Sequence, residues 1–267
     1  MLKDVTLGQY FPGKSPVHRL DPRTKLLILI LYIVCLFLAE SWISYGVMLL
    51  FLSTTIAISR IPLKAIFRGL KPLIIILIFT GLLNLFLTDG QVLVSFWIIR
   101  ITKEGVFRAI FMMARILMLV TGTFLLTYTT SPIALTDAIE SLLGPLKKLR
   151  VPVHELAMMM CIALRFIPTL IEETDKIISA QKARGADFES GNIFKRAKAL
   201  IPILVPLFIS AFRRADELAT AMECRCYQGG DGRTKMKLLR YKLLDLKAFL
   251  IGFMLLAAII VLGLLGL

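Results

Sequence analysis

Residues 248–267 read AFLIGFMLLAAIIVLGLLGL, an uncharged run of 20 residues that is long enough to cross a lipid bilayer. Four further apolar runs lie upstream: Leu26–Ala39, Ser41–Ser59, Pro72–Thr88 and Val106–Tyr128. Hydrophobic residues make up 57% of the 267-residue chain, compared with about 45–50% in a typical soluble domain. One globular core of this size cannot bury so much apolar surface. The sequence therefore predicts an all-α integral membrane protein with about five transmembrane helices.

The charge distribution predicts how these helices are oriented. The chain carries 32 Lys and Arg against 18 Asp and Glu, a net charge of +14. Cations gather beside the apolar runs, and the segment between the second and third runs has four of them and no acid. Such segments stay in the cytoplasm, next to anionic lipid, so we expect a cytosolic N-terminus. A nucleic-acid partner is disfavoured because no basic face is interleaved with aromatic residues.

Most of the charge lies in one region that is also rich in apolar residues. Thr136–Lys247 holds 19 Lys and Arg and 13 Asp and Glu, which is 32 of the 50 charged residues. Apolar side chains recur there at helical spacing in Val153–Ala183 and Ile193–Cys226, after a shorter helix at Ala134–Leu149. We predict two or three amphipathic helices on the cytosolic side. The chain thus divides into transmembrane helices (1–130), an amphipathic coupling region (131–247) and a last transmembrane helix (248–267).

Each long amphipathic helix is predicted to end at an arginine. Ala183-Arg184-Gly185 closes the first, and Cys224-Arg225-Cys226 closes the second. One interpretation is an ordinary helix end, since cations favour the negative end of the helix dipole and glycine suits the left-handed stop. The other is a docking site, because a guanidinium is planar, always charged and able to bind a carboxylate with two hydrogen bonds.

Several motifs in order resemble one family of membrane proteins. They are SPVHRLDPRTK (15–25), TTSP (129–132), LRFIP (164–168) and the Ala183-Arg184-Gly185 end. With this layout the chain resembles the transmembrane T component, the EcfT family, of energy-coupling factor (ECF) transporters. The first arginine motif matches the family in full, whereas the second keeps only Arg225.

The resemblance implies a non-catalytic subunit of an ATP-driven importer in the cytoplasmic membrane of a bacterium or archaeon. In such a complex the two arginine motifs insert into two cytosolic ATPase subunits. A separate substrate-binding membrane subunit, the S component, takes up a micronutrient such as a vitamin or a metal ion. The alternative from the residues alone is a self-sufficient secondary transporter or channel, but the apolar runs hold few ionisable residues at mid-depth.

Arg115 is the exception, because it lies inside the fourth apolar run. A charge there needs a partner or water, so both a functional role and a structural hydrogen bond to nearby carbonyls stay open. Pro168, Pro202 and Pro206 fall within the two long helices, where we expect them to bend or break the helix.

No catalytic residue, metal site or cofactor is predicted. His154-Glu155 begins a zinc-protease pattern, but position 158 holds Met158 instead of the second histidine. The chain has only two histidines and no phosphate-binding loop of the G-x-x-x-x-G-K-[ST] type. Four scattered cysteines make no disulfide framework.

Overall fold

The chain folds into two units, each with its own internal contacts. The structure, a computed structural model, describes residues 10–88, 91–96, 99–186, 188, 192–230 and 238–265. One unit, here called the membrane unit, comprises residues 8–138 and 238–267. The other, here called the hairpin unit, takes its described residues from 139–230. The helix α7 (Pro132–Leu143) contains the boundary between them.

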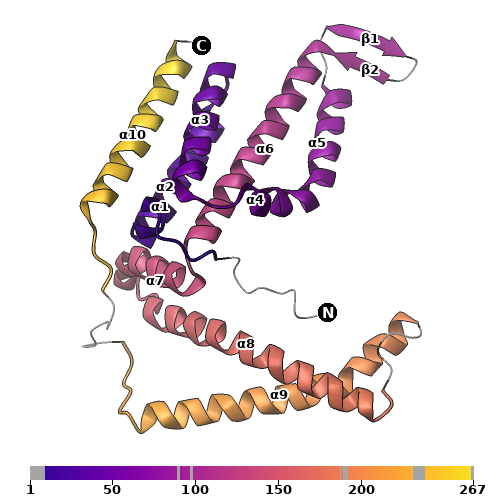
Figure 1. Ribbon diagram of the computed structural model, residues 1–267, viewed down its shortest axis with the longest axis vertical. Helices are drawn as coiled ribbons and strands as arrows, with labels where there is room; N and C mark the ends of the chain where they lie inside the picture. Colours follow the sequence, from indigo (N-terminus) through magenta and orange to yellow (C-terminus); the bar gives the residue numbers. More distant parts are fainter. Residues whose placement is uncertain are drawn as a thin grey trace. The chain divides into compact units, whose positions relative to one another are not determined.

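The membrane unit is built from long helices, and its first two helices start at a Ser-Pro and an Asp-Pro pair. Its main helices are α2 (Pro22–Leu38), α3 (Trp42–Ser59), α6 (Lys103–Thr129) and α10 (Leu243–Leu264), and the short α1 (Pro16–Arg19) precedes them (Figure 1). Ser15 caps α1 and Asp21 caps α2, with proline at the first helical position of each. An oxygen-bearing cap followed by proline satisfies a free N–H and fixes the first helical turn.

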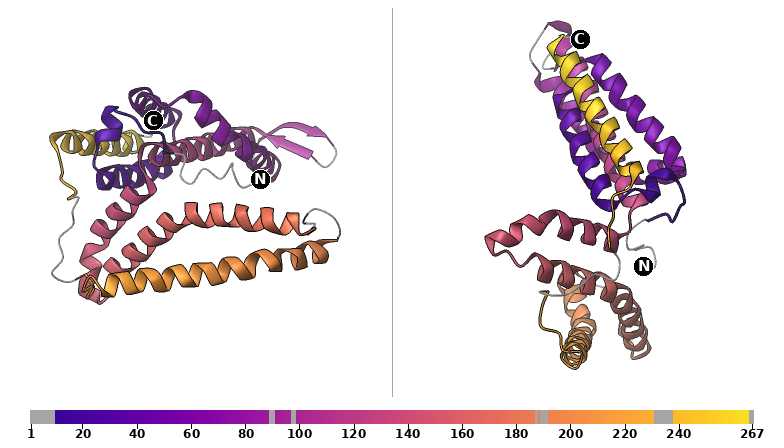
Figure 2. Two further views of the ribbon diagram at one scale, coloured as in Figure 1. Left: turned by 60° about the horizontal axis from the view of Figure 1, so that its bottom comes forward. Right: turned by 90° about the vertical axis from the view of Figure 1, so that its left-hand side faces the viewer.

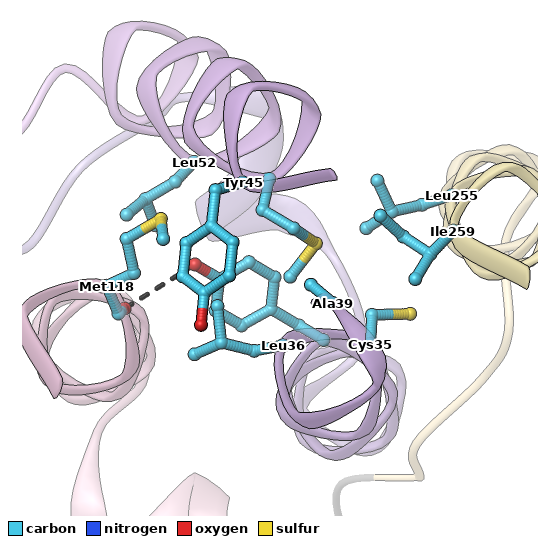
Figure 3. Close-up of a cluster of buried hydrophobic side chains, with 10 residues drawn as sticks. Cys35, Leu36, Ala39, Tyr45, Leu52, Met118, Leu255 and Ile259 are labelled. Carbon is cyan, nitrogen blue, oxygen red and sulfur yellow. Dashed lines mark hydrogen bonds between the residues drawn. The ribbon is translucent and has the colours of Figure 1, made fainter. Parts of the chain in front are cut away.

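Side chains from four helices form the core of the membrane unit. Leu36 of α2, Met48 of α3, Met118 of α6 and Ile259 of α10 are all buried. Figure 3 shows that the labelled members of this cluster converge from all four helices. Tyr32 on α2 donates a hydrogen bond of 3.5 Å to the Met118 carbonyl. Burial of this cluster holds α2, α3, α6 and α10 together.

A bent helical segment and a β-hairpin complete the membrane unit. The chain runs through α4 (Leu63–Leu70), the 3₁₀ turn η2 (Lys71–Leu73) and α5 (Ile74–Leu87), which packs on α6. Figure 1 shows α4 and α5 running in different directions, and Pro72 lies at the start of the turn between them. The strands β1 (Val92–Phe96) and β2 (Ile99–Thr102) pair antiparallel, with Ser95 opposite Arg100.

The hairpin unit consists mainly of two antiparallel helices of 31 residues each. After α7 the 3₁₀ helix η3 (Gly144–Leu149) leads into α8 (Val153–Ala183), and α9 (Ile193–Glu223) returns beside it (Figure 2). Pro168 lies inside α8, and Pro202 and Pro206 lie inside α9, yet both helices continue through them. The sequence predicts that these prolines bend or break the helices, and the described residues of α8 and α9 contain no break at any of them. Figure 1 shows α9 changing direction in its amino-terminal part, which contains Pro202 and Pro206.

The prediction of an all-α membrane protein with about five spans is confirmed, with the β-hairpin as a small addition. Five helical stretches of the described chain are long and apolar enough to cross a bilayer: Trp42–Ser59, Leu63–Phe86, Lys103–Thr129, Val153–Ala183 and Leu243–Leu264. α2 has 17 residues and is shorter than these. Val153–Ala183 is α8, which is predicted from the sequence to be an amphipathic arm. Its length and composition alone therefore do not decide whether α8 crosses the bilayer.

Candidate functional site

The carboxyl end of α8 places Arg184 at the helix terminus. Ala183 is the last helical residue, Arg184 is the C-cap, and Gly185 follows with φ of +85°. The Ala186 N–H donates to the Gln181 carbonyl at 3.0 Å, and the Gly185 N–H donates to the Lys182 carbonyl at 3.0 Å. These two bonds make a Schellman motif, which ends a helix at a left-handed residue. We call residues 183–185 the first tip.

The carboxyl end of α9 has the same two capping hydrogen bonds. The Tyr227 N–H donates to the Met222 carbonyl at 3.1 Å, and the Cys226 N–H donates to the Glu223 carbonyl at 2.8 Å. Cys226 takes the left-handed position, with φ of +54°. Arg225 therefore lies directly before the left-handed residue, as Arg184 does, although α9 ends at Glu223 and α8 ends at Ala183. We call residues 224–226 the second tip. It differs from the first tip in sequence but ends in the same Schellman motif.

The two tips lie at opposite ends of the hairpin unit. Near the end of α8, Gln181 Nε2 donates to the Pro202 carbonyl at 3.4 Å. Further along, Glu173 accepts hydrogen bonds from Ser210 and Arg214, the latter at 3.3 Å. At the start of α8, the chain after α9 passes so close to the His154 ring that any Cβ on Gly230 would clash with it. Because 31 helical residues span roughly 46 Å, the antiparallel arrangement keeps the tips far apart.

Both tip arginines are exposed and free to meet a partner. Ala183, Arg184, Gly185 and Arg225 are all solvent-exposed. Within the described part of the chain, neither guanidinium takes part in an ion pair or a side-chain hydrogen bond. Arg214, by contrast, pairs with Glu173 and lies 6.0 Å from the Phe166 ring. Thus Arg214 of α9 forms an ion pair within the hairpin unit, whereas Arg225 is exposed after the end of α9.

Exposed apolar side chains also accumulate along the two long helices. They are Leu156, Met159 and Met160 on α8, and Phe194, Leu200, Ile201, Leu204, Val205, Phe208, Ile209 and Phe212 on α9. In the hairpin unit, only Val153, Ala157 and Ile203 are buried hydrophobic residues among those described. Exposed apolar side chains in these numbers mark a surface that contacts lipid or another protein, and we call these residues of α8 and α9 the apolar strip.

Arg115 contacts the turn that joins α2 to α3. Its Nη2 donates to the Ala39 carbonyl at 3.1 Å, and its Nε donates to the Tyr45 hydroxyl at 2.9 Å. Its guanidinium lies 5.6 Å from the Phe37 ring. The carbonyl that Arg115 bonds belongs to the residue after α2, which lacks an intrahelical partner. Arg115 thus joins α6 to the end of α2.

A buried polar cluster that was not predicted from the sequence links α10 to the start of α2. Asp245 is 1% exposed; its Oδ1 accepts the Asp21 N–H at 2.8 Å and its Oδ2 accepts the Lys242 N–H at 2.7 Å. Beside it, Lys25 Nζ donates to the Thr129 carbonyl at 2.8 Å. The last span was predicted to begin at residue 248, which left Asp245 in the amphipathic coupling region 131–247. The signal that could have found it is an acid three residues after Lys242 and three residues before the apolar run that begins at residue 248.

The described residues contain no group of three or more His, Cys, Asp and Glu that could hold a metal ion. His154 Nδ1 lies 3.0 Å from Glu140 Oε1, so the histidine of the incomplete zinc pattern contacts a residue of α7.

Comparison with known proteins gives consistent matches over most of the chain. The family model CbiQ, described as cobalt transport protein, matches residues 13–236. A protein of Ruminiclostridium cellulolyticum called energy-coupling factor transporter transmembrane protein EcfT is 56% identical over 245 residues, 92% of each chain. The proteins of the same name from Bacillus subtilis and Lactococcus lactis are 50% identical over 238 residues and 47% identical over 245 residues. These alignments cover 89% and 91% of this chain and 90% and 92% of the relatives.

The resemblance inferred from residues 15–25, 129–132, 164–168 and 183–185 is thereby confirmed. The matches extend through both units and include both tips. This chain belongs to the family of energy-coupling factor transporter transmembrane proteins, multi-pass membrane proteins of the EcfT type that form one component of a larger transporter.

Proposed function

We propose that this chain is the non-catalytic coupling subunit of an ECF importer, and that Arg184 and Arg225 dock into two cytosolic ATPase subunits. The observation that carries the proposal is the pair of equivalent tips. Two exposed arginines each lie directly before the left-handed residue of a Schellman motif, at opposite ends of one hairpin. Two similar ATPases each need a similar contact, and a guanidinium fits an acidic groove with paired hydrogen bonds.

The hairpin suits the transmission of movement between such partners. Each tip is the end of a continuous helix, so a displacement of the ATPase moves the whole helix as a rod. The side chains of Gln181, Glu173 and Arg214 link α8 to α9 along their length. When ATP binding draws two ATPases together, the two tips would approach and the angle between the helices would change. The exposed apolar strip would then shift against its neighbour.

We place α8 outside the hydrocarbon core, although its length and composition would allow a span. Its carboxyl-terminal part, from Glu172 to Lys182, carries five charged side chains. Charges of this density are costly in hydrocarbon. The same helix exposes apolar side chains such as Leu156 and Met160 near its amino end. A helix of this kind lies at an interface, with its charged tip in the cytosol.

The apolar strip of α8 and α9 is the proposed contact with a separate substrate-binding membrane subunit. That subunit would bind a micronutrient, a vitamin or a metal ion, and this chain would reposition it. A surface without directional polar contacts allows sliding, and methionines such as Met159 and Met160 adapt to a changing neighbour. In this arrangement the N-terminus lies in the cytosol, together with both tips.

Charge reversal at the tips tests the docking proposal. In full transporter complexes purified from membranes, Arg184→Glu and Arg225→Glu should each weaken retention of ATPase by about 30-fold or more, because an interfacial charged pair is lost. The double variant should lose both ATPases. Arg213→Glu is the matched control, because Arg213 is an exposed arginine within α9 and not at a tip. A double tip variant that assembles and transports like the unaltered chain would exclude this docking mode.

A further inference from the structure

The four cysteines of the chain have very different surroundings, and two of them flank a tip arginine. None of them forms a disulfide; Cys35 is buried and Cys161 is half-buried. Cys224 and Cys226 are exposed and lie directly before and after Arg225. Thiols react only where a reagent can reach them. Reaction at exposed sites of this chain should therefore concentrate at the second tip.

The first tip provides an internal comparison for these two thiols. Ala183 and Gly185 occupy the positions that correspond to Cys224 and Cys226, and the capping hydrogen bonds of the two tips are the same. Gly185 has no side chain at the left-handed position, whereas Cys226 holds a Cβ and a thiol there at φ of +54°. The two tips thus present a guanidinium in the same way, but only the second presents sulfur beside it.

We propose that Cys224 and Cys226 form a modification site for anionic low-molecular-weight disulfides, which blocks docking at the second tip alone. This inference rests on the proposed docking role of Arg225. A cysteine thiolate attacks one sulfur of the disulfide, so a protein–sulfur bond forms as the original S–S bond breaks. The protein thiol is oxidised, and the released half of the disulfide leaves as a reduced thiolate that takes up the proton lost by the cysteine. An added dithiol reverses the step.

The adduct interferes with docking through both its size and its charge. A glutathione-type adduct places two carboxylates and one ammonium group next to the Arg225 guanidinium. The carboxylates can pair with that guanidinium in the same chain and so compete with the acidic groove of the ATPase. The adduct also covers backbone that would face the groove. The first tip, with Ala183 and Gly185, cannot be modified in this way, so one ATPase stays bound.

The test uses the full chain in detergent and oxidised glutathione as the probe. After treatment, mass spectrometry should find adducts at Cys224 or Cys226, and the treated chain should retain about one ATPase where the untreated chain retains two. The matched variant C224A/C226G reproduces the first tip, and its retention should be the same before and after treatment. A C35A/C161A variant keeps only the tip thiols and should respond as the unaltered chain does. Chain already bound to both ATPases should be modified at least ten-fold more slowly.

Two results would overturn the proposal in distinguishable ways. If the tip is fully modified and both ATPases are still retained while Arg225→Glu loses one, thiol modification does not control docking and the docking role stands. If neither modification nor Arg225→Glu affects retention, the docking role itself is wrong. Failure of oxidised glutathione to modify either tip thiol in the free chain would also exclude the site.

Discussion

Charged residues have opposite surroundings in the two units of this molecule. In the membrane unit, Asp245, Lys25 and Arg115 each bond backbone groups of a neighbouring helix. In the hairpin unit, Arg184 and Arg225 are exposed and bond no described side chain. The membrane unit also has a core from four helices, whereas among the described residues of the hairpin unit only Val153, Ala157 and Ile203 are buried hydrophobic residues. The buried charges of the membrane unit are satisfied by its own chain, whereas the proposed function leaves the tip charges of the hairpin unit to be paired by partners.

This difference separates two kinds of mutational effect. Loss of a buried charge in the membrane unit leaves backbone groups unpaired and should lower the free energy of unfolding. Loss of a tip charge removes nothing that the chain itself uses and should lower only the binding of partners. The following changes test this separation, from the largest expected effect to the smallest.

Asp245→Ala should have the largest effect on stability. It removes both carboxylate oxygens that accept the Asp21 and Lys242 N–H groups in a buried site. Two unsatisfied N–H groups should lower the free energy of unfolding by about 3 kcal/mol. Denaturant titration of the purified chain in detergent would measure this. Asp216→Ala, at an exposed acid of α9, is the control and should change stability little. Equal losses in both variants would contradict the buried-cluster interpretation.

The long helices of both units could be predicted from the sequence because they depend on composition and helical period. α8 has the bounds that were predicted, and α9 ends three residues earlier. The local capping role of Asp245 could have been found from its spacing to Lys242, but its bond to the Asp21 N–H could not, because Asp21 is 224 positions away in the chain. For Pro168, Pro202 and Pro206 the sequence left both a bend and a break open; both helices continue, since a proline cost near 3 kcal/mol can be offset by packing.

The second tip shows why motif matching was incomplete. Only Arg225 of Cys224-Arg225-Cys226 matched the family motif. The backbone at Cys226 nevertheless adopts the left-handed conformation that Gly185 adopts after α8. Cysteine is uncommon in the left-handed region, so a cysteine at position 226 does not indicate from the sequence that the backbone has this conformation. The sequence also did not indicate that the tips lie at opposite ends, because that depends on the antiparallel return of α9 along α8.

Arg115→Met tests whether the intramembrane arginine is structural. The change removes the bonds to the Ala39 carbonyl and the Tyr45 hydroxyl and should lower the free energy of unfolding by about 2 kcal/mol. Retention of ATPase by folded protein should be unchanged. Arg108→Met is a matched control, since Arg108 is an exposed arginine two turns away on α6. If Arg115→Met left stability unaltered but stopped transport, Arg115 would have a functional role instead.

Gly185→Ala and Cys226→Gly should have opposite effects at the two tips. A Cβ at φ of +85° is strained, so Gly185→Ala should lower the free energy of unfolding of the hairpin unit by about 1 kcal/mol. Cys226→Gly should raise it by up to about 1 kcal/mol, because the strain at φ of +54° is relieved. Hydrogen exchange at the last turns of α8 and α9 would report both. Gly144→Ala, where an added Cβ meets no atom within 4 Å, is the control.

Glu173→Gln should have the smallest effect on stability but a specific effect on coupling. Glu173 accepts hydrogen bonds from Ser210 and Arg214, and its ion pair with Arg214 is partly exposed, with side chains 25% and 34% accessible. Such a pair contributes about 0.5 kcal/mol, so the chain should fold and bind both ATPases normally. A weaker link between α8 and α9 should nevertheless lower substrate uptake per ATP hydrolysed in proteoliposomes. Glu172→Gln, at the exposed neighbouring carboxylate, is the control and should leave uptake per ATP unchanged. Equal uptake per ATP in both variants would mean that Glu173 does not link α8 to α9.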